Sequence, residues 1–218
     1  RLVAYASNRE GNWDLYIARL DAPAAVTQVT LDATDDICPA WSPDGKRLVY
    51  ASRTGEGPWQ IVLTDIASRV KTFLGAGLYP DWSPDAKDPW ICFQSQPRDT
   101  GGRSGVWVVR PDGTGLREIA GDKARLWSAL HPRYSPCGKW IVYASLRKSP
   151  EARLFGAPTD ADDLWIIRPD GTLEMRLTEE PSGESWPAWG GGRVFFISNR
   201  DGARNLYSLG VKPLEDHP

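Results

Sequence analysis

Short apolar runs, each bounded by turn-forming residues, recur along the whole chain. Three of them span 48–52, 91–95 and 141–145, and each follows a segment that contains Ser-Pro. Runs of this length, rich in Val, Ile, Tyr and Phe, predict β-strands. No segment has the spacing of a long amphipathic helix, so the pattern predicts an all-β chain.

The turn and the strand after it form a repeat. Residues 41–46 read WSPDGK, 82–87 read WSPDAK and 134–139 read YSPCGK, and a degraded copy begins at Trp189. The strands that follow end at serines 43 to 53 residues apart, namely Ser7, Ser52, Ser95, Ser145 and Ser198. A period of about 45 residues is that of a β-propeller blade.

Each copy has room for four strands. Ser-Pro-Asp-Gly suits a type I turn between the first two strands, since proline fixes φ and glycine is tolerated at the fourth position. A third strand and a weaker fourth follow, the latter at Val26–Leu31 and Glu174–Thr178. We expect one β-propeller domain over 1–211, with about five four-stranded antiparallel blades and a polar tail at 212–218. The recurring Trp is expected to wedge between neighbouring blades.

The WSPDGK…LVYAS…DLYI pattern resembles the WD-like repeats of TolB-type β-propellers. The same repeat style occurs in the propellers of prolyl-oligopeptidase-type serine peptidases. The TolB resemblance implies six blades as the usual number, and accessory work in envelope assemblies of the bacterial periplasm. Here the first copy lacks the strand before its turn and the fifth stops after its third strand, at Val211. We therefore expect five blades with an open seam, or six with one lost or supplied elsewhere.

The amino-acid composition excludes several classes of function. The 218 residues include 26 basic and 28 acidic side chains, so there is no basic excess of the kind that binds nucleic acid. No apolar run approaches the roughly 20 residues of a membrane helix. The only histidines are His131 and His217, and no G-x-S-x-G, HExxH or phosphate-binding loop is present. We expect no catalytic residues, no resident metal and no cofactor.

The cysteine content and the N-terminal residues give information about the cellular compartment of the protein. Three cysteines, Cys38, Cys92 and Cys137, are too few for a disulfide framework, and at least one is expected to be free. Cys92 lies in an apolar run and is expected to be buried. Arg1 leads directly into a strand-like segment with no signal peptide, which suggests a processed or trimmed chain.

A candidate binding face follows from strand direction. The Ser-Pro turns lie on one face, so the connections into each first strand lie on the other, where a propeller channel opens. The first strands align on four prolines, and the preceding residues all differ: Cys38, Tyr79, His131 and Trp186. Two residues further back stand Asp36, Gly77, Ala129 and Glu184. Purely packing positions would repeat their residue type, so Asp36, Tyr79, His131, Glu184 and Trp186 are candidate ligand contacts. Sequence drift in exposed loops would leave the same pattern.

Two long loops add candidates on that face. The segment 96–105 carries Arg98 and Arg103, and the segment 146–163 carries Arg147, Arg153 and Phe155. Loops this long are often functional, and Phe155 is a candidate apolar anchor for another protein. Packing of Phe155 on the adjacent blade is the alternative.

Recurring arginines follow the strand-ending serines, at Arg9, Arg53, Arg147 and Arg200. They fit either a basic rim for an acidic peptide or a salt bridge within each blade. Two cation sites were also considered, one formed by Asp160, Asp162 and Asp163 and one by Asp36 with Glu184. The three aspartates lack the full calcium-loop spacing with its distal glutamate, whereas Asp36 and Glu184 could share a cation in the channel; our prediction is no metal.

Together these features favour a non-enzymatic propeller that presents its channel mouth and long loops to a protein or peptide partner. The TolB resemblance implies a periplasmic location. One alternative is the propeller of a larger serine peptidase, whose hydrolase domain would lie outside this sequence. Another is a carbohydrate-binding or lyase-like propeller, although the family's lyases hold a metal with several histidines.

Overall fold

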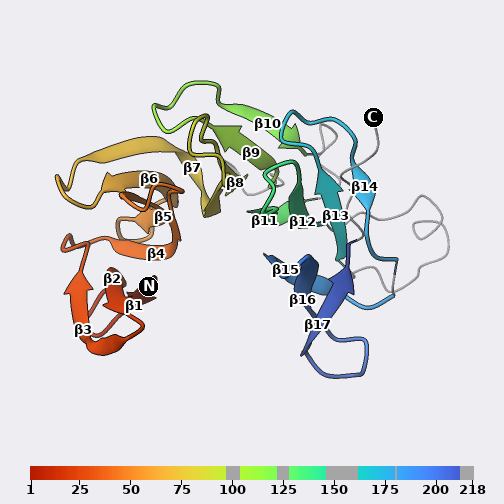
Figure 1. Cartoon of the computed structure of the whole chain (residues 1–218), viewed down its shortest axis with the longest axis horizontal. Helices are drawn as coiled ribbons and strands as arrows, with labels where there is room; N and C mark the ends of the chain where they lie inside the picture. Colours follow the sequence, from red (N-terminus) through yellow and green to blue (C-terminus); the bar gives the residue numbers. More distant parts are fainter. Residues whose placement is uncertain (97–103, 122–127, 146–161, 180, 212–218) are drawn as a thin grey trace. The chain divides into compact units, whose positions relative to one another are not determined.

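The computed structural model describes residues 1–96, 104–121, 128–145, 162–179 and 181–211. Within these ranges the chain consists of strands and turns and contains no helix (Figure 1). The first eight strands are β1 (Leu2–Ser7), β2 (Asp14–Arg19), β3 (Ala22–Gln28), β4 (Asp35–Trp41), β5 (Arg47–Arg53), β6 (Gln60–Asp65), β7 (Lys71–Trp82) and β8 (Ile91–Ser95). The others are β9 (Val106–Val109), β10 (Arg117–Ala120), β11 (Ala129–Tyr134), β12 (Ile141–Ser145), β13 (Asp163–Ile167), β14 (Met175–Arg176), β15 (Glu184–Gly190), β16 (Arg193–Ser198) and β17 (Asn205–Gly210). The predicted all-β fold is confirmed.

Strands that follow one another in the chain are neighbours in the sheets. β1–β3 form one sheet, β4–β10 a second, β11–β14 a third and β15–β17 a fourth. The twelve-residue strand β7 serves two ladders, because Lys71–Ala76 pairs with β6 whereas Gly77–Trp82 pairs with β8. In the part of the chain that the structure describes, no sheet closes on itself.

Contacts divide the chain into two compact units. The first comprises residues 1–96 and 108–117, and the second comprises 97–107 and 118–218. The first unit has a core of Leu15 and Ile17 on β2, Leu48 and Tyr50 on β5, and Val29, which follows β3. The second has a core of Trp140, Val142, Ala144, Leu164, Ile166, Val194 and Phe196.

The Ser-Pro turns have the expected geometry. After β4, the Gly45 N–H donates to the Ser42 carbonyl at 2.9 Å, and Gly45 has φ of 69°. The Ser42 hydroxyl also accepts the Arg47 N–H at 2.9 Å and bonds to Asp44. Serine and aspartate therefore close the turn, and glycine supplies the left-handed residue that ends it.

Two of the recurring tryptophans, Trp41 and Trp189, pack against clusters to which two sheets contribute, as a wedge between sheets would. Trp41 packs on the first unit's core, which contains residues of both β2 and β5. Trp189 packs in the same way on the second unit's core, between β13 and β16. Cys92, expected to be buried, is 0% exposed.

The fourth strands differ from their predicted bounds for a shared reason. Leu15 N–H donates to the side-chain hydroxyl of Thr30 at 2.9 Å, and Leu164 N–H donates to that of Thr178 at 2.9 Å. A hydroxyl replaces the backbone acceptor at each position, so the regular ladder ends earlier. β3 (Ala22–Gln28) and β14 (Met175–Arg176) therefore end before Leu31 and Thr178, the ends predicted for Val26–Leu31 and Glu174–Thr178.

Candidate functional site

The residue before each aligned proline has a left-handed backbone. The φ angles lie between 53° and 56° at Cys38, Tyr79, His131 and Trp186. This region disfavours L-residues with side chains by about 1–2 kcal/mol. Its recurrence in four strands makes it a built-in feature of the repeat.

Each of these residues lies at a break in strand pairing. The register shifts between Ile37/Ala40, Leu78/Asp81, Leu130/Arg133 and Ser185/Ala188, which leaves the residue and its proline outside the ladder. Proline has no N–H to donate, so an irregularity of this kind is where a strand tolerates it. The four side chains belong to strand bulges rather than to drifting loops, and a bulge re-aims its side chains.

In the second unit, two of these side chains stack. The His131 and Trp186 rings have centroids 3.9 Å apart and planes inclined by 17°. Trp186 is 47% exposed, whereas His131 is half-buried. Neighbouring first strands thus present one composite aromatic surface, with the indole toward solvent.

The stack is uncharged near neutral pH. Burial, with a smaller contribution from the Arg133 cation, lowers the pKa of His131 to about 4. A neutral imidazole stacks on indole without the desolvation cost of a buried cation.

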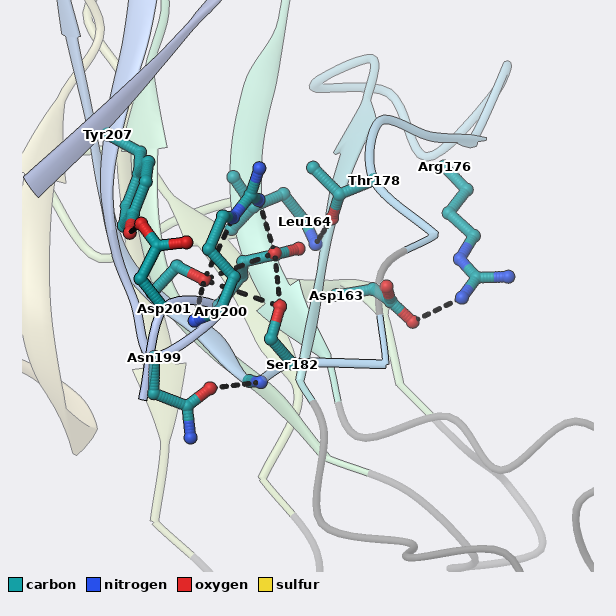
Figure 2. Close-up of polar contacts among 12 residues, drawn as sticks. Asp163, Leu164, Arg176, Thr178, Ser182, Asn199, Arg200, Asp201 and Tyr207 are labelled. Atoms are coloured by element: carbon teal, nitrogen blue, oxygen red, sulfur yellow. Dashed lines mark hydrogen bonds and ion pairs between the residues drawn. The ribbon is translucent and has the colours of Figure 1, made fainter. Parts of the chain in front are cut away.

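Glu184, two residues before Trp186, belongs to a polar network with Arg200 and Ser182, two residues that are labelled in Figure 2. Its side chain is 0% exposed, and its Oε1 atom accepts from Arg200 Nη2 at 2.6 Å. The Ser182 hydroxyl donates to the same oxygen at 3.3 Å, and the Ser198 hydroxyl at 3.5 Å. The carboxylate therefore ties β15 to β16 and supports the strand that carries Trp186.

Asp36 has the equivalent place in β4 and is also 0% exposed. The Thr34 hydroxyl donates to it at 3.2 Å. Burial raises the pKa of Asp36, while hydroxyl hydrogen bonds and the charge of Lys71 act against that rise. Asp36 and Glu184 thus are buried carboxylates, each two residues before the pre-proline residue of its own strand.

The strand-following arginines make contacts within their own repeats. Arg53 pairs with Asp35 at 3.2 Å, and Arg200 pairs with Glu184. Arg9 instead donates to the hydroxyls of Ser7 and Tyr5, and its guanidinium lies 4.4 Å from the Tyr16 ring centroid. For Arg53 and Arg200, the structure bears out the salt-bridge alternative, a pair within one repeat.

Several sequence candidates lie outside the described residues, namely Arg98, Arg103, Arg147, Arg153, Phe155 and Asp160. Within the described ranges, no three His, Cys, Asp or Glu side chains are grouped to hold a metal ion. Asp163 pairs with Arg176 at 2.6 Å, and burial raises its pKa. In the same ranges no helix has the length and apolar character needed to cross a membrane.

The left-handed geometry was not anticipated from the sequence. The available signal was the X-Pro dipeptide in a strand-like segment, at the same place in four copies. Proline in a strand interior points to an edge or a bulge. Only the folded chain reveals that the residue before the proline adopts the left-handed conformation.

Searches for related proteins give matches to parts of longer chains, and no protein-family model matches. A TolB homolog of Chlorobium luteolum is 26% identical over 148 residues, covering 66% of this chain and 31% of that protein. A Tol-Pal system protein TolB of Anaeromyxobacter sp. strain K is 30% identical over 145 residues, covering 65% and 29%. The chain thus spans less than a third of the length of either relative.

Solved structures agree on the fold. TolB of Acinetobacter baumannii superposes with a TM-score of 0.70 at 19% identity, covering 95% of this chain and 49% of that one. The fold is that of a TolB-type β-propeller.

Peptidases also carry TolB-like propellers. A prolyl endopeptidase matches with a TM-score of 0.63 at 13% identity, covering 95% of this chain and 32% of that one. A tricorn protease homolog of Streptomyces coelicolor is 27% identical over 220 residues, which cover 94% of this chain and 18% of the homolog. One TolB-type scaffold is thus found both in TolB proteins and inside large peptidases.

Proposed function

We propose that this chain is a non-enzymatic, TolB-like binding propeller. It presents its pre-proline residues to a protein or peptide partner. The observation that carries the proposal is the stacked pair of His131 and Trp186, held at two strand bulges with the indole 47% exposed. Rigid, half-exposed aromatic groups on a strained backbone are typical of interaction hot spots.

The candidate residues have different roles in this proposal. Tyr79, His131 and Trp186 contact the partner. Glu184 is completely buried and fixes the strand that carries Trp186, and Asp36 has the equivalent buried place in β4. The loop residues Arg98, Arg103, Arg147, Arg153 and Phe155 are proposed as further contacts.

The relatives support partner binding as the activity. Two matched proteins are named for TolB, one of them as part of the Tol-Pal system, which indicates work within a multi-protein assembly. We extend that role to this chain, with an extracytoplasmic location and no resident cofactor. Fold alone does not fix function, so the proposal depends on the aromatic pair.

Affinity capture from an extract of the source organism tests the proposal. Trp186→Ala should reduce capture of the partner by about tenfold or more without changing the thermal midpoint, as expected for an exposed hot-spot aromatic. Phe73→Ala is the matched control, since Phe73 is 57% exposed on β7 and lies outside the candidate surface. Equal capture by both variants would refute the assignment.

A second candidate is the propeller of a larger peptidase. It is favoured by the tricorn protease homolog, which matches 94% of this chain with only 18% of its own length. The mass of the native polypeptide discriminates the two. An excess of about 25 kDa or more over the 218 residues would be a further domain and would favour the peptidase.

A further inference from the structure

One edge of the β1–β3 sheet is open. The sheet order is β1-β2-β3, so among the described residues β1 has a neighbouring strand on one side only. The equivalent strands β5, β12 and β16 each have two neighbours, because a first strand (β4, β11 or β15) pairs with each of them. The open edge includes none of the pre-proline residues, and its assignment is independent of the proposed function.

Strand β1 lacks the features that usually protect a sheet edge. Proteins commonly place a charged side chain, a proline or a bulge on such a strand. Leu2–Ser7 contains none of these, and all six residues pair with β2 without a register shift. Val3 is 40% exposed, whereas Leu48, its counterpart in β5, is 0% exposed. The edge is therefore suited to the addition of another strand.

Ala4 and Ala6 direct their main-chain groups toward this edge. The Arg1 carbonyl accepts the Leu20 N–H at 3.0 Å, and bonded residues alternate along an antiparallel ladder. The odd-numbered residues of β1 therefore bond to β2, and the N–H and C=O groups of Ala4 and Ala6 point the other way. In the described part of the chain no strand meets them there.

Arg9 follows β1 and repeats two contacts of Arg200 in the β15–β17 sheet. Its Nε atom donates to the Ser7 hydroxyl at 3.1 Å, and its guanidinium lies 4.4 Å from the Tyr16 ring centroid. Arg200 Nε donates to the Ser198 hydroxyl at 3.3 Å, and its guanidinium lies 4.7 Å from the ring centroid of the third-strand tyrosine. The two arginines thus have equivalent places in their repeats.

A third contact of Arg200 has no equivalent at Arg9. Arg200 Nη2 donates at 2.6 Å to Glu184, which lies on the first strand β15, opposite the last serine of β16. The β1–β3 sheet has no such strand among the described residues, and Arg9 Nη2 donates instead to the Tyr5 hydroxyl at 2.9 Å. A carboxylate opposite Ser7 on an added strand would complete the pair.

The nearby acid of β2 does not neutralise Arg9. Asp14 lies opposite Ser7, but its carboxylate accepts from the Gln28 amide at 3.1 Å and from the Thr30 hydroxyl at 3.0 Å. No ion pair of Arg9 is found in the part of the chain that the structure describes. Its side chain is exposed, so the positive charge is accessible to a partner.

We propose that the β1 edge binds an extended acidic peptide as an added antiparallel strand, with an Asp or Glu side chain on Arg9. The first strands β4 and β15 supply the pattern, since Asp36 and Glu184 each lie three residues before a proline. In this register the carboxylate lies opposite Ser7, and the next peptide residue exchanges hydrogen bonds with Ala6. Main-chain bonds of this kind give affinity, and the charged pair gives specificity.

Fluorescence anisotropy with a labelled peptide tests the edge, using the sequence of residues 183–190, GESWPAWG. The 218-residue chain should bind it saturably with a Kd of about 1 mM or tighter. A peptide with glutamine in place of its glutamate should bind about tenfold more weakly, since a hydrogen bond between charged groups is lost. Arg9→Gln should weaken binding of the glutamate peptide about tenfold and leave that of the glutamine peptide unchanged.

Methylated peptides test the main-chain bonds without changing the protein. Methylation of the serine nitrogen removes the N–H that donates to the Ala6 carbonyl in the proposed register, and it should abolish binding. Methylation of the glutamate nitrogen is the matched control, since the Glu184 N–H donates to the Asp162 carbonyl at 2.7 Å rather than to β16. That peptide should bind with unchanged affinity.

Arg19→Gln is the matched control in the protein. Arg19 lies opposite Leu2, at the other end of the β1–β2 ladder, and pairs with Asp21, so this variant should bind normally. No saturable binding up to about 1 mM, equal affinity for the glutamate and glutamine peptides, or equal effects of the two arginine variants would overturn the proposal. Sedimentation that shows an Arg9-dependent dimer without peptide binding would assign the edge to a second copy and would also overturn it.

Discussion

The imidazole of His131 stacks on the indole of Trp186, although the two residues are 55 positions apart in the sequence. Each lies immediately before a proline, and each has a left-handed backbone. The repeat thus uses one irregularity to bring together different side chains from neighbouring strands. That combination lets a shared scaffold carry a surface specific to this chain.

Acidification should weaken the fold through His131. Its pKa falls to about 4 on folding, from an ordinary value of 6.5, so the unfolded chain binds the proton more readily. The stabilisation is complete above pH 6.5 and is lost as the pH falls toward 4, amounting to about 3 kcal/mol at most. His131→Phe keeps a stacked ring without titrating. Urea unfolding from pH 7 to 4 should show the stability advantage of the natural chain shrinking, and a pH-independent difference would contradict the assignment.

Asp36 should have the opposite effect on the pH dependence of stability: its contribution should increase on acidification. Burial raises its pKa above the ordinary 3.8, so the folded chain holds this proton more readily. The contribution is complete below pH 3.8 and is lost as the pH rises through the folded-state pKa. In the same unfolding series, the stability of the natural chain relative to Asp36→Asn should increase as the pH falls. A difference that decreases would mean that the carboxyl is charged and stabilised in the folded protein.

At position 186, the glycine variant should be more stable than the alanine variant. Both substitutions remove the indole, but glycine adopts a left-handed backbone without steric cost, so Trp186→Gly should be more stable than Trp186→Ala by about 1 kcal/mol. Leu206 on β17 is the control, since it is 69% exposed and does not have a positive φ. There the usual strand preference should make the glycine variant the less stable one. Chemical denaturation of the four variants measures both differences, and the same order at both positions would argue against backbone strain.

Trp41, which packs between two sheets, should contribute strongly to the free energy of unfolding. Trp41→Ala leaves a cavity beside Leu15 and Ile17 and should lower the free energy of unfolding by about 3 kcal/mol or more. Trp13→Ala is the comparison, because Trp13 is 43% exposed and should matter much less. A loss below about 1 kcal/mol at Trp41 would show that the ring does not act as a wedge.

Sequence reasoning located the strands because their signals are local. Alternating apolar runs, Ser-Pro-Asp-Gly turns and a repeat of about 45 residues are each set by a few neighbouring residues. Even the positions of the candidate contacts could be found from the sequence, since Cys38, Tyr79, His131 and Trp186 differ at one place in the repeat. The predicted ends of two strands were less accurate, because the hydroxyls of Thr30 and Thr178 replace a backbone acceptor there.

The sequence by itself determined the all-β repeat, its turns and the tryptophans that separate the sheets. The tertiary structure alone decided which variable side chains meet and which are buried. Glu184 and Trp186 are two residues apart, yet the first is fully buried and the second is half-exposed. Their difference depends on a register shift and on partners such as Arg200 from another strand. Such non-local pairings have no signature in any single segment, and so only the folded chain specifies them.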